Sequence, residues 1–267
     1  MEFDIYLQGR CSKEDDLYFL RFFQEYETAS APIQYQYRLE DSRLADVRRL
    51  VENEIRYIPQ GTFALQCQLM HWVHRRLVPG DGSPVHPLNT LSVLDQTEKG
   101  RCVSNCWVHA IVLNEVFLSF GFLSRMVRCL PLDLRPGDCH CMTLAYSEDH
   151  HKWIAFDAAM GTYYTDSDGK PLSLKEMREA LIRGEGLGTP FVPRRTSRNL
   201  CWYLCKNFIR FQSFQVSCFN MEELECEQVI YTLNPRQYRI KDKEILYASR
   251  RVAMKMVYSD DDFWLTK

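Results

Sequence analysis

The chain has 267 residues, a formal net charge of −2 and 46% hydrophobic residues, which is the composition of a globular protein with a substantial core. This charge gives no general attraction to nucleic acid or to anionic membranes, so neither is expected as a partner. The apolar runs are shorter than the roughly 18 residues of a membrane-spanning helix. Acidic residues stand near the N-terminus where a secretion signal carries basic ones. A soluble, cytoplasmic protein is therefore expected.

Helical periodicity dominates the first part of the chain. In residues 41–57, apolar side chains such as Leu44 and Val47 recur every three or four positions, opposite a charged face. Ser104 and Gly121 are typical residues for the start and the end of a helix. The spacing predicts helices over residues 15–28, 41–57, 63–78 and 104–120.

The pattern changes after residue 124. Short segments rich in aromatic and β-branched residues, separated by turn residues, favour strands. Ser173 and Glu176 form a capping-box pattern, and Gly184 is placed to end the helix that follows. We predict strands at 124–132, 140–147, 152–159, 228–233 and 253–259, and helices at 173–184 and 199–211. Helices first and an antiparallel sheet later indicate one α+β domain over residues 1–267.

The chain has eleven cysteines, an odd number without a secretion signal, which favours reduced thiols over a disulfide framework. Cys102 and Cys106 have three residues between them, a spacing compatible with zinc, which needs four ligands. The donors at 139–141 alternate between the two faces of a strand and do not converge on one ion. Structural zinc stays an alternative, but we expect neither a metal nor a cofactor. Cys201 and Cys205, one turn apart on an apolar face, are predicted to pack in the core.

Cys106 is the candidate nucleophile. If Ser104 caps the helix, Cys106 lies in its first turn, where the helix dipole and free N–H groups lower a thiol pKa and can stabilise an oxyanion. Folding the following strands into a hairpin with its turn at 148–149 places His140 directly opposite Asp157. Asp157 can then orient His140, and His140 can act as the base for a thiol.

These stretches resemble the transglutaminase-like superfamily of cysteine acyl-transfer enzymes and peptidases. The segment NCWVHA at 105–110 is similar to the stretch around the family's nucleophile, and GFLSR at 121–125 is similar to a motif that follows it. DCHCMTLAY and KWIAFDAA, within 138–159, are similar to the block that carries the family's His and Asp. The resemblance maps the triad onto Cys106, His140 and Asp157.

The resemblance implies a papain/transglutaminase-like core with N-terminal helices, a central helix that carries the cysteine, and an antiparallel sheet that carries His and Asp. The best-matching core covers about 60–190, preceded by a helical part at 1–59 and followed by an extension at 200–267. It also implies a thiolate that attacks an amide or ester carbonyl. The resulting thioester passes to water, as in a peptidase or deamidase, or to an amine. The expected substrate is a peptide or protein amide, with an amine as a possible second substrate.

Two positions depart from the family pattern. Ala158 follows the orienting acid where the family has proline, and Asn105 precedes the nucleophile where the family has glutamine. Asn105, Trp107, His109 and Trp72 are candidates for lining a cleft, although packing is the favoured interpretation of the last three. The alternative from a different class is a catalytically inactive transglutaminase-like binding module, for which the altered step after Asp157 leaves room.

Overall fold

The computed structural model describes residues 13–28, 33–78, 80, 85–100, 104–132, 139–190, 197–224, 228–238 and 253–265. Its first half is largely helical, and most strands follow residue 124, as the sequence predicts. The helices are α2 (Lys13–Phe22), α3 (Ser42–Glu54), α4 (Thr62–Arg76), α5 (Thr90–Glu98), α6 (Cys106–Ser119), α7 (Leu174–Arg183), α8 (Ser197–Asn207), α10 (Asp260–Leu265) and the short 3-10 helix η2 (Met221–Leu224). The strands are β1 (Gln36–Tyr37), β2 (Ser124–Leu130), β3 (His140–Ser147), β4 (Lys152–Asp157), β5 (Thr162–Tyr163), β6 (Arg210–Phe214), β7 (Val216–Ser217), β8 (Val229–Leu233) and β9 (Ala253–Val257).

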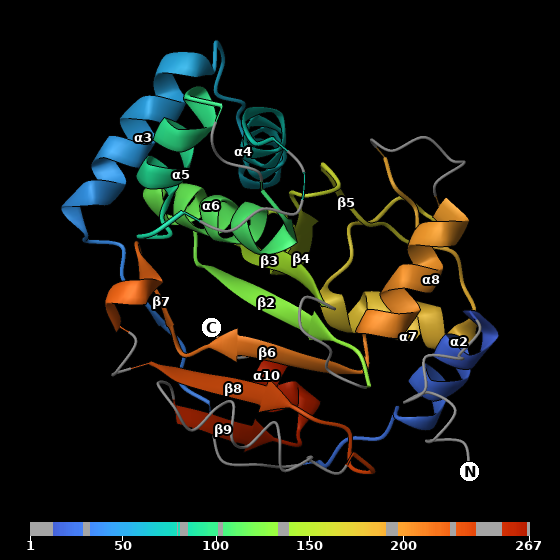
Figure 1. Ribbon diagram of the computed structural model, residues 1–267. Helices are drawn as coiled ribbons and strands as arrows, with labels where there is room; N and C mark the ends of the chain where they lie inside the picture. Colours follow the sequence, from blue (N-terminus) through green and yellow to red (C-terminus); the bar gives the residue numbers. More distant parts are fainter. Residues whose placement is uncertain are drawn as a thin grey trace.

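A seven-stranded sheet forms the centre of the fold, with strand order β5-β4-β3-β2-β6-β8-β9. Neighbouring strands are antiparallel except β8 and β9, which run parallel. Figure 1 shows that strands from the middle of the chain and from its last third lie side by side in this sheet. The result is a mixed α+β fold with a mostly antiparallel sheet.

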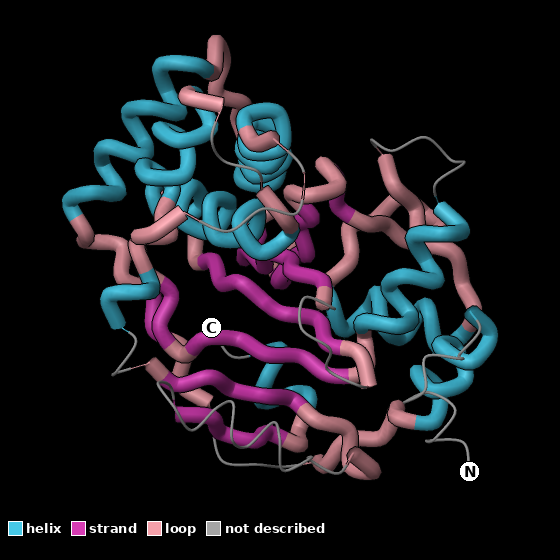
Figure 2. The backbone as a smooth tube through the Cα atoms, in the orientation of Figure 1, coloured by secondary structure: helices cyan, strands magenta, loops and turns pink. Residues whose placement is uncertain are grey.

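The sheet separates two apolar cores. Helices α3 to α6 gather on one face, and α2, α7, α8 and α10 pack on the other (Figures 1 and 2). Successive strand residues point to opposite faces. Accordingly Met126 and Cys141 belong to the α6 core, whereas Val127 and Met142 belong to the other.

Helix α6 is buried along almost its whole length. All of its residues from Val108 to Ser119 are buried, and it packs directly on β2 and β3. A helix that is apolar on all sides is stable only when other elements surround it. Here α3, α4 and α5 supply that cover, so the N-terminal helices position the start of α6 against the sheet.

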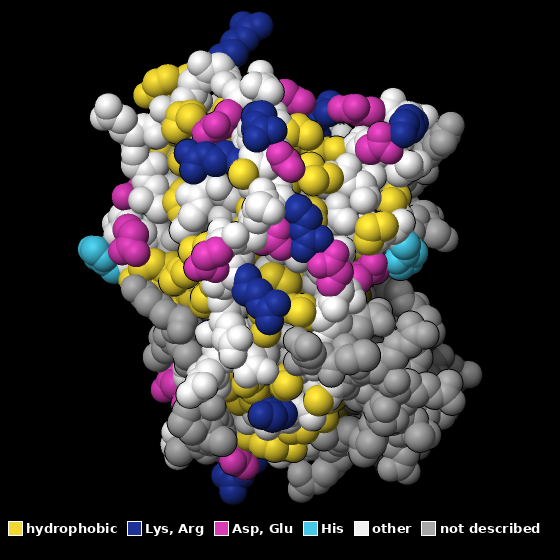
Figure 3. Space-filling view, turned by 90° about the vertical axis from the view of Figure 1, so that its left-hand side faces the viewer, with side chains coloured by type: hydrophobic (Ala, Val, Ile, Leu, Met, Phe, Trp, Pro, Cys, Tyr) yellow, Lys and Arg dark blue, Asp and Glu magenta, His cyan; other side chains and the backbone are white. Residues whose placement is uncertain are grey.

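The outer face of α3 is polar, as its sequence pattern predicts. Arg48 pairs with Glu52 and Arg49 with Asp46 on this surface. Figure 3 shows basic and acidic side chains interspersed over the face in view. Such exposed pairs contribute little to stability and mark a solvated surface.

A buried arginine on β2 connects the segment before β1 with the C-terminal helix α10. The Arg125 guanidinium lies 4.0 Å from the ring centroid of Tyr35 and 4.2 Å from that of Trp153. It also donates to the carbonyl oxygens of Phe263 and Trp264, each at 3.2 Å. Sandwiched guanidinium groups with charge-assisted hydrogen bonds are stable in a buried setting.

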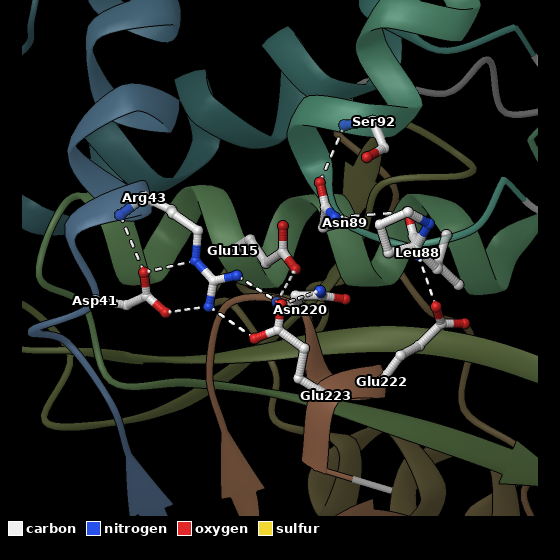
Figure 4. A network of polar contacts seen from close by, with 10 residues as sticks. Asp41, Arg43, Leu88, Asn89, Ser92, Glu115, Asn220, Glu222 and Glu223 are labelled. Carbon is white, nitrogen blue, oxygen red and sulfur yellow. Dashed lines mark hydrogen bonds and ion pairs between the residues drawn. The ribbon is translucent and has the colours of Figure 1, made fainter.

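A buried carboxyl group, that of Glu115, holds the helices around α6 together. One carboxylate oxygen of Glu115 accepts from the backbone N–H of Thr90 at 2.6 Å, and the other accepts from that of Asn220 at 2.8 Å. Nearby, the Arg43 guanidinium donates to Asp41 and Glu223 (Figure 4). These contacts connect α3, α5, α6 and the turn before η2.

Most element boundaries differ by a few residues from the sequence prediction, and the helix predicted over 15–28 ends at Phe22. Helix α6 begins at Cys106, and the helix predicted over 199–211 ends at Asn207, after which β6 starts at Arg210. Helix α5 was not predicted at all. Within the described part of the chain, no helix combines the length and the apolar character that crossing a bilayer requires.

Candidate active site

Cys106 is the first residue of α6, and Asn105 is its N-cap. The Asn105 side-chain oxygen accepts from the backbone N–H of Val108 at 3.2 Å. The prediction that Ser104 is the cap is therefore wrong. The backbone N–H of Ser104 instead donates to the carbonyl oxygen of Val78 at 2.7 Å, which holds Ser104 in an extended bridge before the helix. Both residue types can cap a helix, and here the tertiary pairing of Ser104 leaves that position to Asn105.

The β3–β4 hairpin brings His140 and Asp157 together, although in a different register from the predicted one. Ser147 pairs with Lys152 rather than with His150, so the turn covers 148–151 instead of 148–149. Direct pairing of His140 with Asp157 is therefore wrong, and the two lie diagonally across the strands. Because the shift moves the partner strand by an even number of residues, both side chains still point to the same face. His140 Nε2 lies 2.7 Å from Asp157 Oδ2.

Asp157 is fully buried and holds three hydrogen bonds. Its Oδ2 accepts from the Tyr164 hydroxyl at 2.9 Å and contacts His140, while Oδ1 accepts from the backbone N–H of Met160 at 3.1 Å. Burial by itself raises the pKa of a carboxyl group, but the charge of His140 and these donors outweigh it. The pKa of Asp157 is consequently lower than its usual value.

His140 is buried between this carboxylate and the candidate nucleophile. Burial lowers its pKa, but the charge and hydrogen bond of Asp157, together with those of Cys106, raise it to about 10. Because Nε2 faces Asp157, Nδ1 is the nitrogen left for the thiol. The Tyr203 ring covers the imidazole edge-on, with ring centroids 5.3 Å apart.

The Cys106 thiol is partly exposed and strongly acidic. A hydrogen bond from the Cys141 thiol contributes most to lowering its pKa; burial opposes this, and His140 adds a hydrogen bond and a charge. The pKa of Cys106 falls to about 4. With His140 raised to about 10, a thiolate and an imidazolium coexist over the whole neutral range.

The start of α6 also supplies donors beside the sulfur. The first N–H groups of an α-helix have no acceptor within the helix. Asn105 caps the N–H of Val108, and the N–H groups of Cys106 and Trp107 are the other two of the first turn that lack an intrahelical acceptor. Two N–H groups at this place can hold an oxyanion formed on a carbonyl that Cys106 attacks.

The four cleft candidates occupy different environments. Asn105 is the cap and is partly exposed, and Trp107 packs beneath the Arg128 guanidinium, 5.2 Å from its ring centroid. His109 is 2% exposed, and its Nδ1 contacts the carbonyl oxygen of Asn105. Trp72 is 3% exposed, and its indole donates to Glu54 at 2.9 Å. The structure thus places His109 and Trp72 in the interior rather than on a surface open to substrate.

Sequence reasoning missed several neighbours of the three candidate residues. Tyr164 contacts Asp157 across the turn that follows β4, Tyr203 comes from α8, and Cys141 hydrogen-bonds to Cys106. For Cys141 the sequence carries a signal, because strand alternation places Cys139 and Cys141 on one face, a pattern that also suggests a zinc motif. For the two tyrosines, only the tertiary fold gives the contact.

Metal binding at these thiols has no geometric support in the described residues. No group of three or more His, Cys, Asp or Glu side chains among them is arranged to hold an ion. Cys102, the partner in the zinc alternative, lies outside the described residues.

Comparisons with known proteins find little. No known protein family matches the chain, and no curated protein does. Among solved structures, the chain is similar to a protein from Cytophaga hutchinsonii described as a candidate cysteine protease, with 19% identity and a TM-score of 0.33. The match covers 51% of this chain and 46% of that one, so it spans about half of either protein. A likeness of this size assigns neither a family nor an activity.

Proposed function

We propose that the chain is a cysteine-dependent enzyme with a transglutaminase-like core that cleaves or transfers acyl groups at peptide or protein amide bonds. The observation that supports this most is the buried contact of His140 with Asp157, 2.7 Å long, with the acidic Cys106 thiol on the other side of the imidazole. Burying an ion pair costs desolvation free energy unless hydrogen bonds compensate for the lost water. Strongly shifted pKa values also cluster at functional sites.

The proposed reaction begins with the Cys106 thiolate. Its sulfur attacks the amide carbonyl carbon, and the oxygen that becomes negative is held by the N–H groups at the start of α6. The His140 imidazolium then donates its Nδ1 proton to the leaving nitrogen, and an acyl thioester remains on Cys106. Water or an amine attacks the thioester, with His140 as the base. Asp157 keeps the imidazole oriented and stabilises its charged form.

A binding module without chemistry is the alternative. It requires the same surface but no nucleophile, and it is favoured by the departure at Ala158, where the family pattern has proline. An acidic thiol beside an imidazolium has no evident use in a binding module, and so the enzyme is the better proposal.

Casein, which offers many glutamine side chains and peptide bonds, is a suitable general substrate for a first test. Wild type, Cys106→Ala and Cys67→Ala are incubated with casein, with and without a fluorescent primary amine. Cys67 is a matched control because it is a partly exposed thiol on α4 with a raised pKa. New amino groups report peptide hydrolysis, ammonia alone reports deamidation, and bound fluorophore reports transfer.

We expect at least one of these signals in wild type and in Cys67→Ala, and a rate lower by about 10³-fold or more in Cys106→Ala. Signals of equal size in wild type and Cys106→Ala would contradict the proposed role of Cys106.

A further inference from the structure

Three thiols meet at the start of β3. Cys139 and Cys141 pack with the α6 core, and His140 between them, the first residue of β3, contacts Cys106 as well. The Cys141 thiol lies beside the Cys106 and Cys139 thiols, whose pKa values it lowers. The sulfur of Cys106 also lies 3.8 Å from the carbonyl oxygen of Cys139. The described cysteines of this cluster are all unbridged.

The members of the cluster differ in their access to solvent. Cys106 and Cys139 are partly exposed, whereas Cys141 is 1% exposed and belongs to the α6 core. A small oxidant therefore reaches Cys106 more readily than Cys141. Elsewhere among the described residues, burial raises the pKa of Cys67, Cys129, Cys205 and Cys218, which makes these thiols poor reactants.

We propose that Cys106 and Cys141 form a site of reversible oxidation, at which a peroxide oxidises Cys106 and the Cys141 thiol captures the product as an intramolecular disulfide. This inference goes beyond the proposed amide chemistry and does not depend on it, because it needs only the contact between the two sulfurs and the exposure of one. Oxidation would remove the nucleophile while sparing it from irreversible damage.

The chemistry balances with hydrogen peroxide as the oxidant. The Cys106 thiolate attacks one peroxide oxygen, the O–O bond breaks, and the departing hydroxide takes up a proton to become water. Cys106 is then a sulfenic acid. The Cys141 sulfur attacks the Cys106 sulfur, the S–O bond breaks, and the leaving hydroxide accepts the proton of the Cys141 thiol to form a second water. The sulfurs lose an electron pair and the peroxide gains it. A small dithiol then reduces the disulfide to the Cys106 and Cys141 thiols by thiol–disulfide exchange and is itself oxidised to a cyclic disulfide.

Cys141 is favoured over Cys139 as the partner by its contacts. The Cys141 thiol has the largest influence on the pKa of Cys106, whereas Cys139 contacts the Cys106 sulfur through its backbone carbonyl. The side chain of Cys139 is itself engaged with Cys141 and Arg128. We therefore assign the disulfide to Cys106 and Cys141.

The test follows the oxidation state of the thiols and needs no enzyme substrate. Wild type, Cys141→Ala, Cys139→Ala and Cys67→Ala are treated with stoichiometric hydrogen peroxide. Free thiols are then blocked with N-ethylmaleimide under denaturing conditions, and disulfides and oxygen adducts are located by peptide mass spectrometry. Thermal unfolding of each variant shows which of them are folded.

In wild type we expect a Cys106–Cys141 disulfide that lowers the mass by about 2 Da and that dithiothreitol reverses. Cys139→Ala and Cys67→Ala should behave in the same way. In Cys141→Ala, Cys106 should proceed to the sulfinic acid, about 32 Da heavier, which dithiothreitol does not reverse.

Sulfinic acid at Cys106 in wild type, without a disulfide, would overturn the proposal, and so would a disulfide from Cys106 to Cys139. If Cys141→Ala does not fold, the disulfide map of wild type alone decides the question. Because amide turnover is not measured, a failure here leaves the proposed function standing, and a failure of that function leaves this inference standing.

Discussion

The charge on His140 depends on its carboxylate neighbour. Burial lowers the pKa of His140, and Asp157 is the first of the groups that raise it to about 10. In Asp157→Asn the pKa of His140 should fall, because burial is then opposed by Cys106 alone. Titration of the His140 ring nitrogens by NMR measures this. Asp149→Asn is the control, since the Asp149 carboxylate accepts from the backbone N–H of Phe63 instead. A His140 midpoint that is unchanged in Asp157→Asn would contradict the assignment.

The Tyr164 hydroxyl holds the buried carboxylate in place. It donates to Asp157 Oδ2 at 2.9 Å, and a hydrogen bond to a charged group is worth about 2 kcal/mol. Tyr164→Phe should lower the free energy of unfolding by about this amount in urea at neutral pH. Tyr203→Phe is the matched control, because the Tyr203 hydroxyl donates to the neutral carbonyl of Cys139 at 3.3 Å and should cost about 1 kcal/mol or less. Equal losses in the two variants would show that the carboxylate contact has no special weight.

At the scale of elements, the start of α6 positions the sulfur and its neighbouring N–H groups. Asn105→Ala removes the cap and should lower the free energy of unfolding by about 1 kcal/mol. It should also slow alkylation of Cys106, because a frayed first turn loses the ordered N–H groups and dipole that stabilise the thiolate. Asn89→Ala removes the equivalent cap of α5, where Asn89 accepts from the backbone N–H of Ser92 at 3.0 Å. It should cost similar stability and leave Cys106 alkylation unchanged; equal slowing in both variants would contradict this account.

The hairpin shows which features of a site a sequence can predict. Strand alternation places His140 and Asp157 on one face, and this survives an error in the turn length because the register moved by an even number of residues. The turn itself was not predictable from local residues, and the diagonal contact depends on it. The prediction of one helix over 199–211, where the structure has α8 followed by β6, was wrong for a similar reason. A helix and a strand are equally compatible with the apolar residues Phe208, Ile209 and Phe211. Their packing in the core and the pairing of β6 with β2 determine that a strand forms.

Across the whole molecule, Glu115 couples folding to pH. Burial raises its pKa to about 7, against about 4.3 in an unfolded chain. Between these values the folded state binds the proton that the unfolded state releases. The contribution of Glu115 to the free energy of unfolding is therefore fully present below the pKa of the unfolded state and is lost as pH rises through about 7. Its total size is on the order of 3 kcal/mol. Urea unfolding between pH 4 and 8 should show a downward slope in wild type that is weaker in Glu115→Gln. The same slope in both would exclude Glu115 as its source.

The architecture was partly accessible from the sequence. The α+β class and the order of helices before sheet follow from periodicity alone, whereas the parallel pairing of β8 with β9 and the presence of α5 do not. Helix α5 begins where the buried Glu115 carboxylate meets the N–H of Thr90, so its position is set by a residue far along the chain. The division into 1–59, 60–190 and 200–267 stays a prediction.

The central claim is that Cys106 is a thiolate at neutral pH, paired with the His140 imidazolium. The rate of iodoacetamide alkylation at Cys106, located by peptide mass spectrometry and followed from pH 4 to pH 9, measures it most directly. With the pKa of Cys106 at about 4, the wild-type rate should stay nearly constant down to about pH 5, and His140→Gln should move the midpoint upward. A wild-type rate that falls about tenfold per pH unit below about 8.5, as for an ordinary thiol, would contradict the account.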